Sequence, residues 1–166
     1  MSVLKKAPAS SRQKPGKPLS PGSRAITALW SSAERVRTFV AALIEPHGIT
    51  VQQYNVLRIL RGAEPDGLPT LAVAERMIER APGITRMIDR LEAKGLVARE
   101  RRGGDRRCVH CRITRSGLDL LASLDRAVDA ADRAAFGALD ERELAQLTAL
   151  LERVRDAHDA ATTTGD

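Results

Sequence analysis

Two groups of arginine residues have the type and spacing that favour binding of a polyanion. Arg86 and Arg90 are four residues apart, so on a helix they share one face, which Thr85 borders. The second group flanks a glycine pair and consists of Arg101, Arg102, Arg106 and Arg107. Guanidinium groups form charge-assisted hydrogen bonds with phosphates and base edges. Together the groups favour double-stranded DNA as the partner, whereas Arg86 and Arg90 alone are equally compatible with a solvated helix face.

The two cysteines have a Cys-x-x-Cys spacing that invites a metal or redox interpretation. Cys108 and Cys111 fall in a predicted strand, where residues three apart point to opposite faces and cannot both reach one metal. A zinc site would also need two further ligands. We therefore favour ordinary strand residues and predict no metal. Redox sensing stays an alternative, because Arg107 and Arg112 beside the thiols would stabilise the reactive thiolate.

The pattern of polar residues argues against an enzyme. The sequence contains no nucleophile, base and acid set, no phosphate-binding glycine loop and no helical metal motif. We therefore predict no catalytic residue and no cofactor.

The net charge of +6 is unevenly distributed along the 166 residues. Residues 1–24 hold six basic and no acidic residues, residues 76–115 have a net charge of +7, and residues 116–166 have a net charge of −6. A basic central segment beside an acidic end predicts one surface for a polyanion and another for a different partner.

The two ends of the chain differ in composition from the rest. Residues 1–24 contain four prolines and few apolar residues, which predicts a disordered basic arm, either a solubilising tail or a phosphate-contacting arm. Residues 159–166 are predicted to form a flexible tail. With no apolar run of 18 residues and no signal-peptide pattern, we expect a cytoplasmic protein without membrane contact.

Apolar periodicity and capping residues predict the elements that position the arginines. A helix is expected over 25–45, and Thr50 and Gln53 form a capping box for a second helix that ends at Gly62. A loop over 62–69 precedes a short helix over 70–77 and another over 81–94, a helix-turn-helix arrangement.

A hairpin and two long helices follow. Strands are predicted over 96–102 and 107–113, Thr114 caps the next helix, and Asp140 with Glu143 begins the last. The fold class is therefore mainly α with a small β-hairpin.

The chain resembles the MarR (multiple antibiotic resistance regulator) family over residues 26–155. The shared pattern is Thr-Arg-x-x-Asp-Arg-Leu-Glu at 85–92, Gly-Leu-Val at 95–97, Asp-x-Arg at 105–107 and Ile-Thr-x-x-Gly at 113–117. The resemblance implies a winged helix-turn-helix regulator over 25–158, with its DNA-binding part at 50–113. It also implies a homodimer formed by helices within 25–46 and 114–158.

The resemblance assigns roles to residues of the helix-turn-helix and the hairpin. Asp105 resembles the wing aspartate that pairs with an arginine, and Arg107 resembles the arginine that enters the minor groove. Residues 78–83 depart from the family because no Ser or Thr caps the recognition helix, which leaves Pro82 as its only helix starter. The predicted DNA contacts are Arg80, Pro82, Gly83, Thr85, Arg86, Arg90, Arg101, Arg102, Asp105, Arg106 and Arg107.

The resemblance also implies a small phenolic or carboxylate effector, bound between the dimer helices and the winged domain. Trp30 and Tyr54, with His47 as polar partner, are candidate pocket residues, although the two aromatic side chains also suit a hydrophobic core. The expected function is that of a homodimeric repressor that such a ligand releases from a pseudo-palindromic operator. Alternatives are a constitutive DNA-binding protein without effector and the redox sensor described above.

Overall fold

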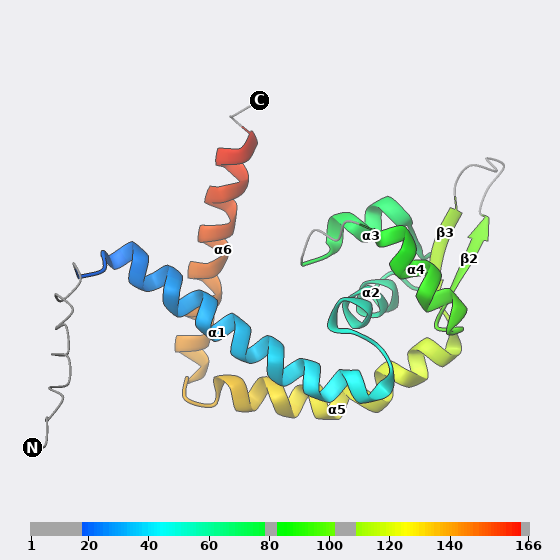
Figure 1. The fold of residues 1–166 in the computed structure, drawn as a ribbon, viewed down its shortest axis with the longest axis horizontal. Coiled ribbons are helices and arrows are strands. Elements are labelled where there is room, and N and C mark those ends of the chain that lie inside the picture. Colours follow the sequence, from blue (N-terminus) through cyan, green and yellow to red (C-terminus); the bar gives the residue numbers. More distant parts are fainter. Residues whose placement is uncertain (1–17, 79–82, 102–108, 164–166) are drawn as a thin grey trace, which may run out of the picture. The chain divides into compact units, whose positions relative to one another are not determined.

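The computed structural model describes residues 18–78, 83–101 and 109–163, and it divides the chain into two compact units, residues 1–34 and 35–166. Figure 1 shows the elements in chain order. They are α1 (Pro21–Ile44), the 3-10 helix η1 (Glu45–His47), α2 (Val51–Arg61), β1 (Leu68–Pro69), α3 (Thr70–Arg76), α4 (Ile84–Ala93), β2 (Val97–Arg101), β3 (Val109–Ile113), α5 (Arg115–Phe136) and α6 (Glu141–Thr163). Among the described residues, no helix is long and apolar enough to cross a membrane.

Helix α2 begins where local side chains satisfy its first amides. The Thr50 hydroxyl accepts a hydrogen bond from the Gln53 amide at 3.2 Å, and the Gln53 side-chain oxygen accepts one from the Thr50 amide at 3.1 Å. This reciprocal pair confirms the predicted capping box. The same motif begins α6, where Asp140 and Glu143 exchange hydrogen bonds.

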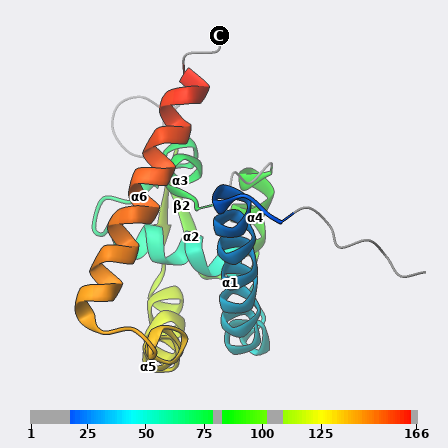
Figure 2. The same ribbon diagram turned by 90° about the vertical axis from the view of Figure 1, so that its left-hand side faces the viewer.

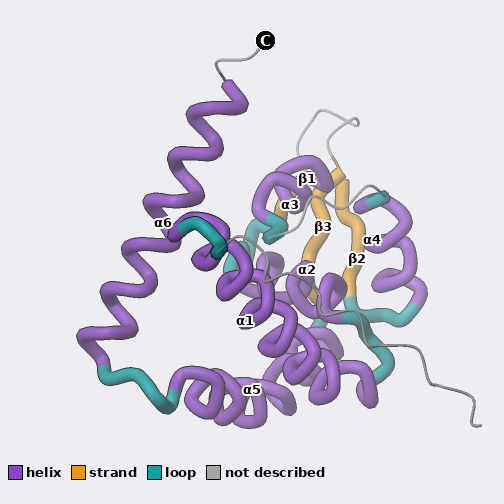
Figure 3. Tube along the Cα trace, turned by 60° about the vertical axis from the view of Figure 1, so that its left-hand side comes forward, coloured by secondary structure: helices purple, strands orange, loops and turns teal. Residues whose placement is uncertain are grey.

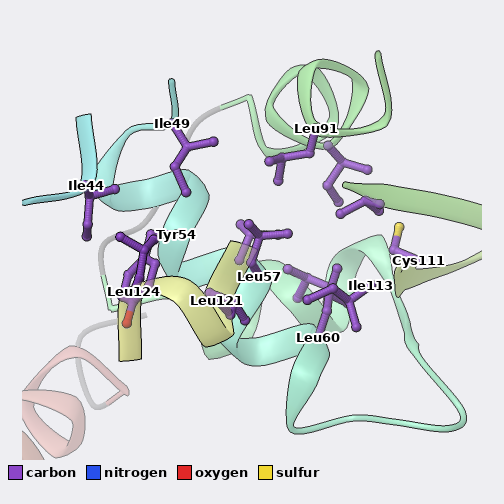
Figure 4. Close-up of a cluster of buried hydrophobic side chains, with 14 of the residues drawn as sticks. Ile44, Ile49, Tyr54, Leu57, Leu60, Leu91, Cys111, Ile113, Leu121 and Leu124 are labelled. Atoms are coloured by element: carbon purple, nitrogen blue, oxygen red, sulfur yellow. The ribbon is translucent and has the colours of Figure 1, made fainter. Parts of the chain in front are cut away.

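The hydrophobic core lies around α2. Figure 4 shows side chains of this cluster, whose members come from α1, α2, α3, α4, the strands and α5 and include Ile49, which precedes α2. Leu57, Leu60, Leu91 and Leu121 are fully buried. Because apolar burial is the main favourable term in folding, this cluster holds the helix-turn-helix and the strands together as one scaffold.

The strands form a three-stranded antiparallel sheet in the order β1, β3, β2 (Figure 3). Arg99 of β2 pairs with Cys111 of β3, and Leu68 of β1 pairs with Cys111 from the other side. The predicted hairpin is confirmed. The strand β1 was missed, because its two residues fall in a segment whose glycine and proline content predicts a loop.

Several boundaries differ from those predicted from the sequence. Helix α1 begins at Pro21, inside the segment expected to be disordered, because Pro at the first position of a helix is well tolerated. Helix α6 continues to Thr163, beyond the predicted boundary at 158 (Figure 2). Helix α4 begins at Ile84 rather than near 81. The residue before it, Gly83, has a left-handed φ of 99°, which is incompatible with a right-handed helix at that position.

Candidate nucleic-acid interface

Helices α3 and α4 form the predicted helix-turn-helix, and α4 has one buried and one exposed face. Ile88 and Leu91 are fully buried in the core. Thr85, Arg86 and Arg90 are exposed. Neither of these two arginines pairs with a carboxylate among the described residues, so their guanidinium groups have donors available for a ligand.

The N-terminal end of α4 lacks a side-chain cap. Gly83 is the N-cap residue, and no side chain bonds to the first amides from that position. A Cβ at Gly83 would meet nothing within 4 Å, so glycine is required there by its φ of +99° and not by lack of space. Arg80 and Pro82 lie outside the described residues.

Arg99 of β2 joins the sheet to α4. Its Nη1 donates to the Glu92 carboxylate at 2.6 Å, and its Nη2 donates to the Asp89 carboxylate at 2.6 Å and to the Thr85 carbonyl oxygen at 3.4 Å. Partial burial acts to lower the pKa of Arg99, but its hydrogen bonds and charge interactions with Asp89 and Glu92 outweigh this and raise the pKa above its usual value. The recognition helix and the hairpin are therefore linked by a charged network.

Arg112 of β3 makes the corresponding contacts on the opposite face of the hairpin. Its guanidinium pairs with Glu100 of β2 at 3.1 Å and with Glu64 of the loop before β1 at 3.6 Å. The hydrogen bond to Glu100 is the main reason that the pKa of Arg112 is raised. Arg112 thus ties the hairpin to the loop before β1, and neither of these two ion pairs involves α4.

Arg99 and Arg112 were not among the predicted site residues. The signal that could have identified Arg99 is strand alternation, because residue 99 shares a face with the buried Val97 and with its partner Cys111. A charged residue on the inner face of a strand needs a partner. Asp89 and Glu92, three residues apart on the preceding helix α4, were available to supply it.

Most of the hairpin tip lies outside the described residues. This applies to Arg102, Asp105, Arg106, Arg107 and Cys108. Arg101 is the last residue of β2 and pairs with Val109 in the ladder.

Cys111 is fully buried in the core, with its sulfur 3.5 Å from the Thr70 hydroxyl. A buried thiol is poorly accessible to oxidants. This position fits the interpretation of Cys111 as a small core residue. Among the described residues, no group of three potential ligands is placed to hold a metal ion.

The predicted effector residues have different environments. Tyr54 is buried in the core with its ring centre 5.9 Å from the Arg58 guanidinium carbon, and burial raises the pKa of its phenol. His47 is exposed in η1, and Trp30 is exposed on α1. A separate open cleft of about 530 Å3 borders the C-terminal end of α4, and its lining includes Glu45, Thr50, Gln53, Arg90 and Lys94.

Helices α1 and α6 each have several apolar side chains that the described part of the chain leaves exposed. On α1 these are Ile26, Leu29, Trp30 and Phe39, and on α6 they are Leu144, Leu150, Leu151 and Val154. Exposed apolar sets at helical spacing are typical of protein–protein contacts.

Comparisons with known proteins agree with this geometry. The MarR family model matches residues 49–109. The crystal structure of a MarR transcription factor from Planctomyces limnophilus is 37% identical, with a TM-score of 0.62, and the match covers 82% of this chain and 98% of that one. The homoprotocatechuate degradative operon repressor of Escherichia coli is 28% identical over 75% of this chain and 83% of its own length.

A further solved structure shares the fold. Bordetella bronchiseptica BpsR, described in a study of the regulation of its DNA binding by 6-hydroxynicotinic acid, is 23% identical with a TM-score of 0.72. The match covers 84% of this chain and 99% of that one.

Proposed function

Because this chain belongs to the MarR family of winged-helix transcriptional regulators, we propose that it is a homodimeric repressor that binds a pseudo-palindromic operator and is released by a small ligand. The observation that carries the proposal is the exposed face of α4, where Thr85, Arg86 and Arg90 lie beside one another on a helix tied to the hairpin by Arg99. A polar and basic helix of this kind suits the major groove, where arginine reads guanine.

The hairpin and the start of α4 supply the remaining contacts in this proposal. Arg107 enters a narrow minor groove, Asp105 positions it, and Arg101, Arg102 and Arg106 bind phosphates. Arg80, Pro82 and Gly83 lie at or before the N-terminal end of α4, where backbone amides favour a phosphate.

The proposed dimer uses the apolar faces of α1 and α6. In a dimer, two copies of α4 would meet successive major grooves about one DNA turn apart, which requires a two-fold symmetric operator. Burial of Ile26, Leu29, Leu150 and Leu151 against a second copy would remove their exposed surface from water.

The proposed effector is a small phenolic or carboxylate compound. The support is the name of the E. coli repressor, which refers to degradation of a phenolic acid, and the reported control of BpsR by 6-hydroxynicotinic acid. The site around Trp30, His47 and Tyr54 stays a prediction. The cleft beside Arg90 and Lys94 is a second candidate site for the effector. A carboxylate bound there would pair with the Arg90 guanidinium group, which would then not be available to contact DNA.

The test is fluorescence anisotropy of the full-length protein on the duplex upstream of its own gene and on a scrambled duplex, over a salt series. We expect selective binding of two protomers per site that persists at physiological salt. Arg90→Gln should weaken selective binding by about 1–3 kcal/mol. Arg126→Gln, which removes the same charge from an exposed position on α5, should leave it unchanged.

Equal binding to both duplexes that disappears with salt would contradict sequence-specific repression at this site and would favour a constitutive, non-specific DNA-binding protein. If selective binding is found, the same assay screens aromatic acids for release.

A further inference from the structure

We propose that Arg99 fixes the rotation of α4 about its own axis and so determines which side chains of α4 meet the DNA. The proposal rests on the proposed function, and it makes Arg99 a positioning residue for sequence selectivity. It requires no contact between Arg99 and DNA.

The first step is the span of the contact along α4. A single guanidinium group reaches the carbonyl oxygen of Thr85 and the carboxylates of Asp89 and Glu92. These residues are four and three apart, so they form one stripe over two helical turns. Because these contacts involve two successive turns of α4, they resist rotation of α4 about its axis as well as its translation relative to the hairpin.

The second step is the position of this stripe around the helix. With 3.6 residues per turn, each residue advances by about 100°, so the Arg86 and Arg90 side chains emerge about 100° around the axis from the Arg99 stripe. The buried residues Ile88 and Leu91 lie on the opposite side of this stripe from Arg86 and Arg90. The stripe thus separates the core face from the face proposed to contact DNA, and rotation of α4 would move Arg86 and Arg90 away from the groove.

The third step is the rigidity of the anchor. Arg99 belongs to a strand whose five residues all pair with β3, from Val97 with Ile113 to Arg101 with Val109. Apolar packing alone is non-directional and tolerates small rotations of a helix. The planar guanidinium group, with donors in a fixed fork, adds the direction that apolar packing lacks.

Arg112 provides a matched comparison. It belongs to the same hairpin, carries the same charge and is also paired with two carboxylates, those of Glu100 and Glu64. Its ion pairs are on the opposite face, and neither of them involves α4. Loss of Arg112 therefore removes a charge and loosens the hairpin without freeing the recognition helix.

The first test compares Arg99→Gln with Arg112→Gln in the full-length protein, using anisotropy on the selective and the scrambled duplex. We expect Arg99→Gln to reduce the ratio of the two affinities by about tenfold or more, the effect of a mismatched base pair. We expect Arg112→Gln to keep the ratio within about twofold, a change too small for a lost base contact. Arg99→Lys keeps the positive charge but lacks the planar set of guanidinium donors that contacts several acceptors at once. This variant should therefore lose selectivity while retaining affinity for the scrambled duplex.

The second test needs no DNA, so it separates failure of this proposal from failure of the proposed function. Hydrogen exchange of backbone amides in Arg99→Gln should be faster than in the wild type over α4 and unchanged over α2 and α5. If Arg99→Gln does not fold, Asp89→Asn and Glu92→Gln weaken the same contacts from the helix side and should act in the same direction. Unchanged exchange over α4, or equal losses of selectivity in Arg99→Gln and Arg112→Gln, would overturn the proposal.

Discussion

Arginines on neighbouring elements have different roles according to the groups that surround them. Arg99 is partly buried and bonded to two carboxylates and a carbonyl oxygen. Arg86 is exposed and has no carboxylate partner among the described residues. Since an ion pair occupies the donors of a guanidinium group, the arginines that pair within the fold contribute less to phosphate binding than their number suggests. The distinction depends on contacts and not on residue type.

Tyr54 gives a prediction at the same scale. Burial raises the pKa of its phenol above the ordinary value of 10.0. The neutral form is thus favoured in the folded state, and the stability that this contributes is present below pH 10 and is lost as the pH rises through the folded-state pKa. We expect the free energy of unfolding to fall above about pH 10 and the fall to be smaller in Tyr54→Phe.

The measurement is urea unfolding of both proteins at pH values from neutral to alkaline. Because the chain contains a single tyrosine, tyrosinate absorbance reports the pKa of Tyr54 directly in the folded and the unfolded protein. An absorbance midpoint that is the same in both states would contradict the prediction.

At the scale of elements, the sequence predicted best those features that depend on local contacts. The α2 cap was found because Thr50 and Gln53 interact across three residues. The strand β1 and the Arg99 network were missed, since both depend on contacts between different elements: Leu68 of β1 pairs with Cys111 of β3, and Arg99 of β2 pairs with Asp89 of α4. The start of α4 was misplaced because the left-handed φ of Gly83 reflects backbone geometry that periodicity does not encode.

The junction between the recognition helix and α5 also gives a prediction. Gly117 lies in the first turn of α5, and a Cβ there would be 2.4 Å from the Leu96 carbonyl oxygen and 2.7 Å from Ile113 Cγ1. Both neighbours are held in place, because Leu96 also accepts a hydrogen bond from the Thr114 amide and Ile113 is in the core. Gly117→Ala should therefore lower the free energy of unfolding by about 1–3 kcal/mol, the usual effect of overpacking.

Chemical denaturation followed by circular dichroism measures this change. Gly62→Ala is the control, because its Cβ would be 3.6 Å from the nearest atom and its φ of −71° suits alanine. We expect Gly62→Ala to change the free energy of unfolding by less than about 1 kcal/mol. Similar losses in the two variants would show that close packing at Gly117 is not the cause.

At the scale of the whole molecule, charge and apolar surface are segregated along the chain. The segment with a net charge of +7, residues 76–115, contains α4 and the hairpin, whereas residues 116–166, with a net charge of −6, contain α6 and nearly all of α5. A polyanion is attracted to the first segment and repelled by the second. The acidic segment also contains the exposed leucines of α6. This separation favours DNA and a second copy of the chain as partners of different surfaces.

The proposed dimer can be tested on α6. Leu150 has 54% of its surface exposed, and it belongs to an apolar stripe with Leu144, Leu147, Leu151 and Val154. Leu150→Glu places a charge in this stripe, where burial against a second copy would desolvate it without a partner. We expect self-association to weaken by about tenfold or more. Because Leu150 lies outside the core, the circular dichroism spectrum should be unchanged.

Sedimentation equilibrium over a concentration series measures the dimer dissociation constant. Ala149→Glu adds the same charge at an exposed position outside the apolar stripe, about 100° around the axis of α6 from Leu150, and should leave that constant unchanged. The weakened dimer should still bind a single half-site, but it should lose the additional affinity of a palindromic duplex, because that gain depends on linkage between two copies. If Leu150→Glu remains as dimeric as Ala149→Glu, the stripe on α6 is not the dimer contact, and another surface must place the two recognition helices one DNA turn apart.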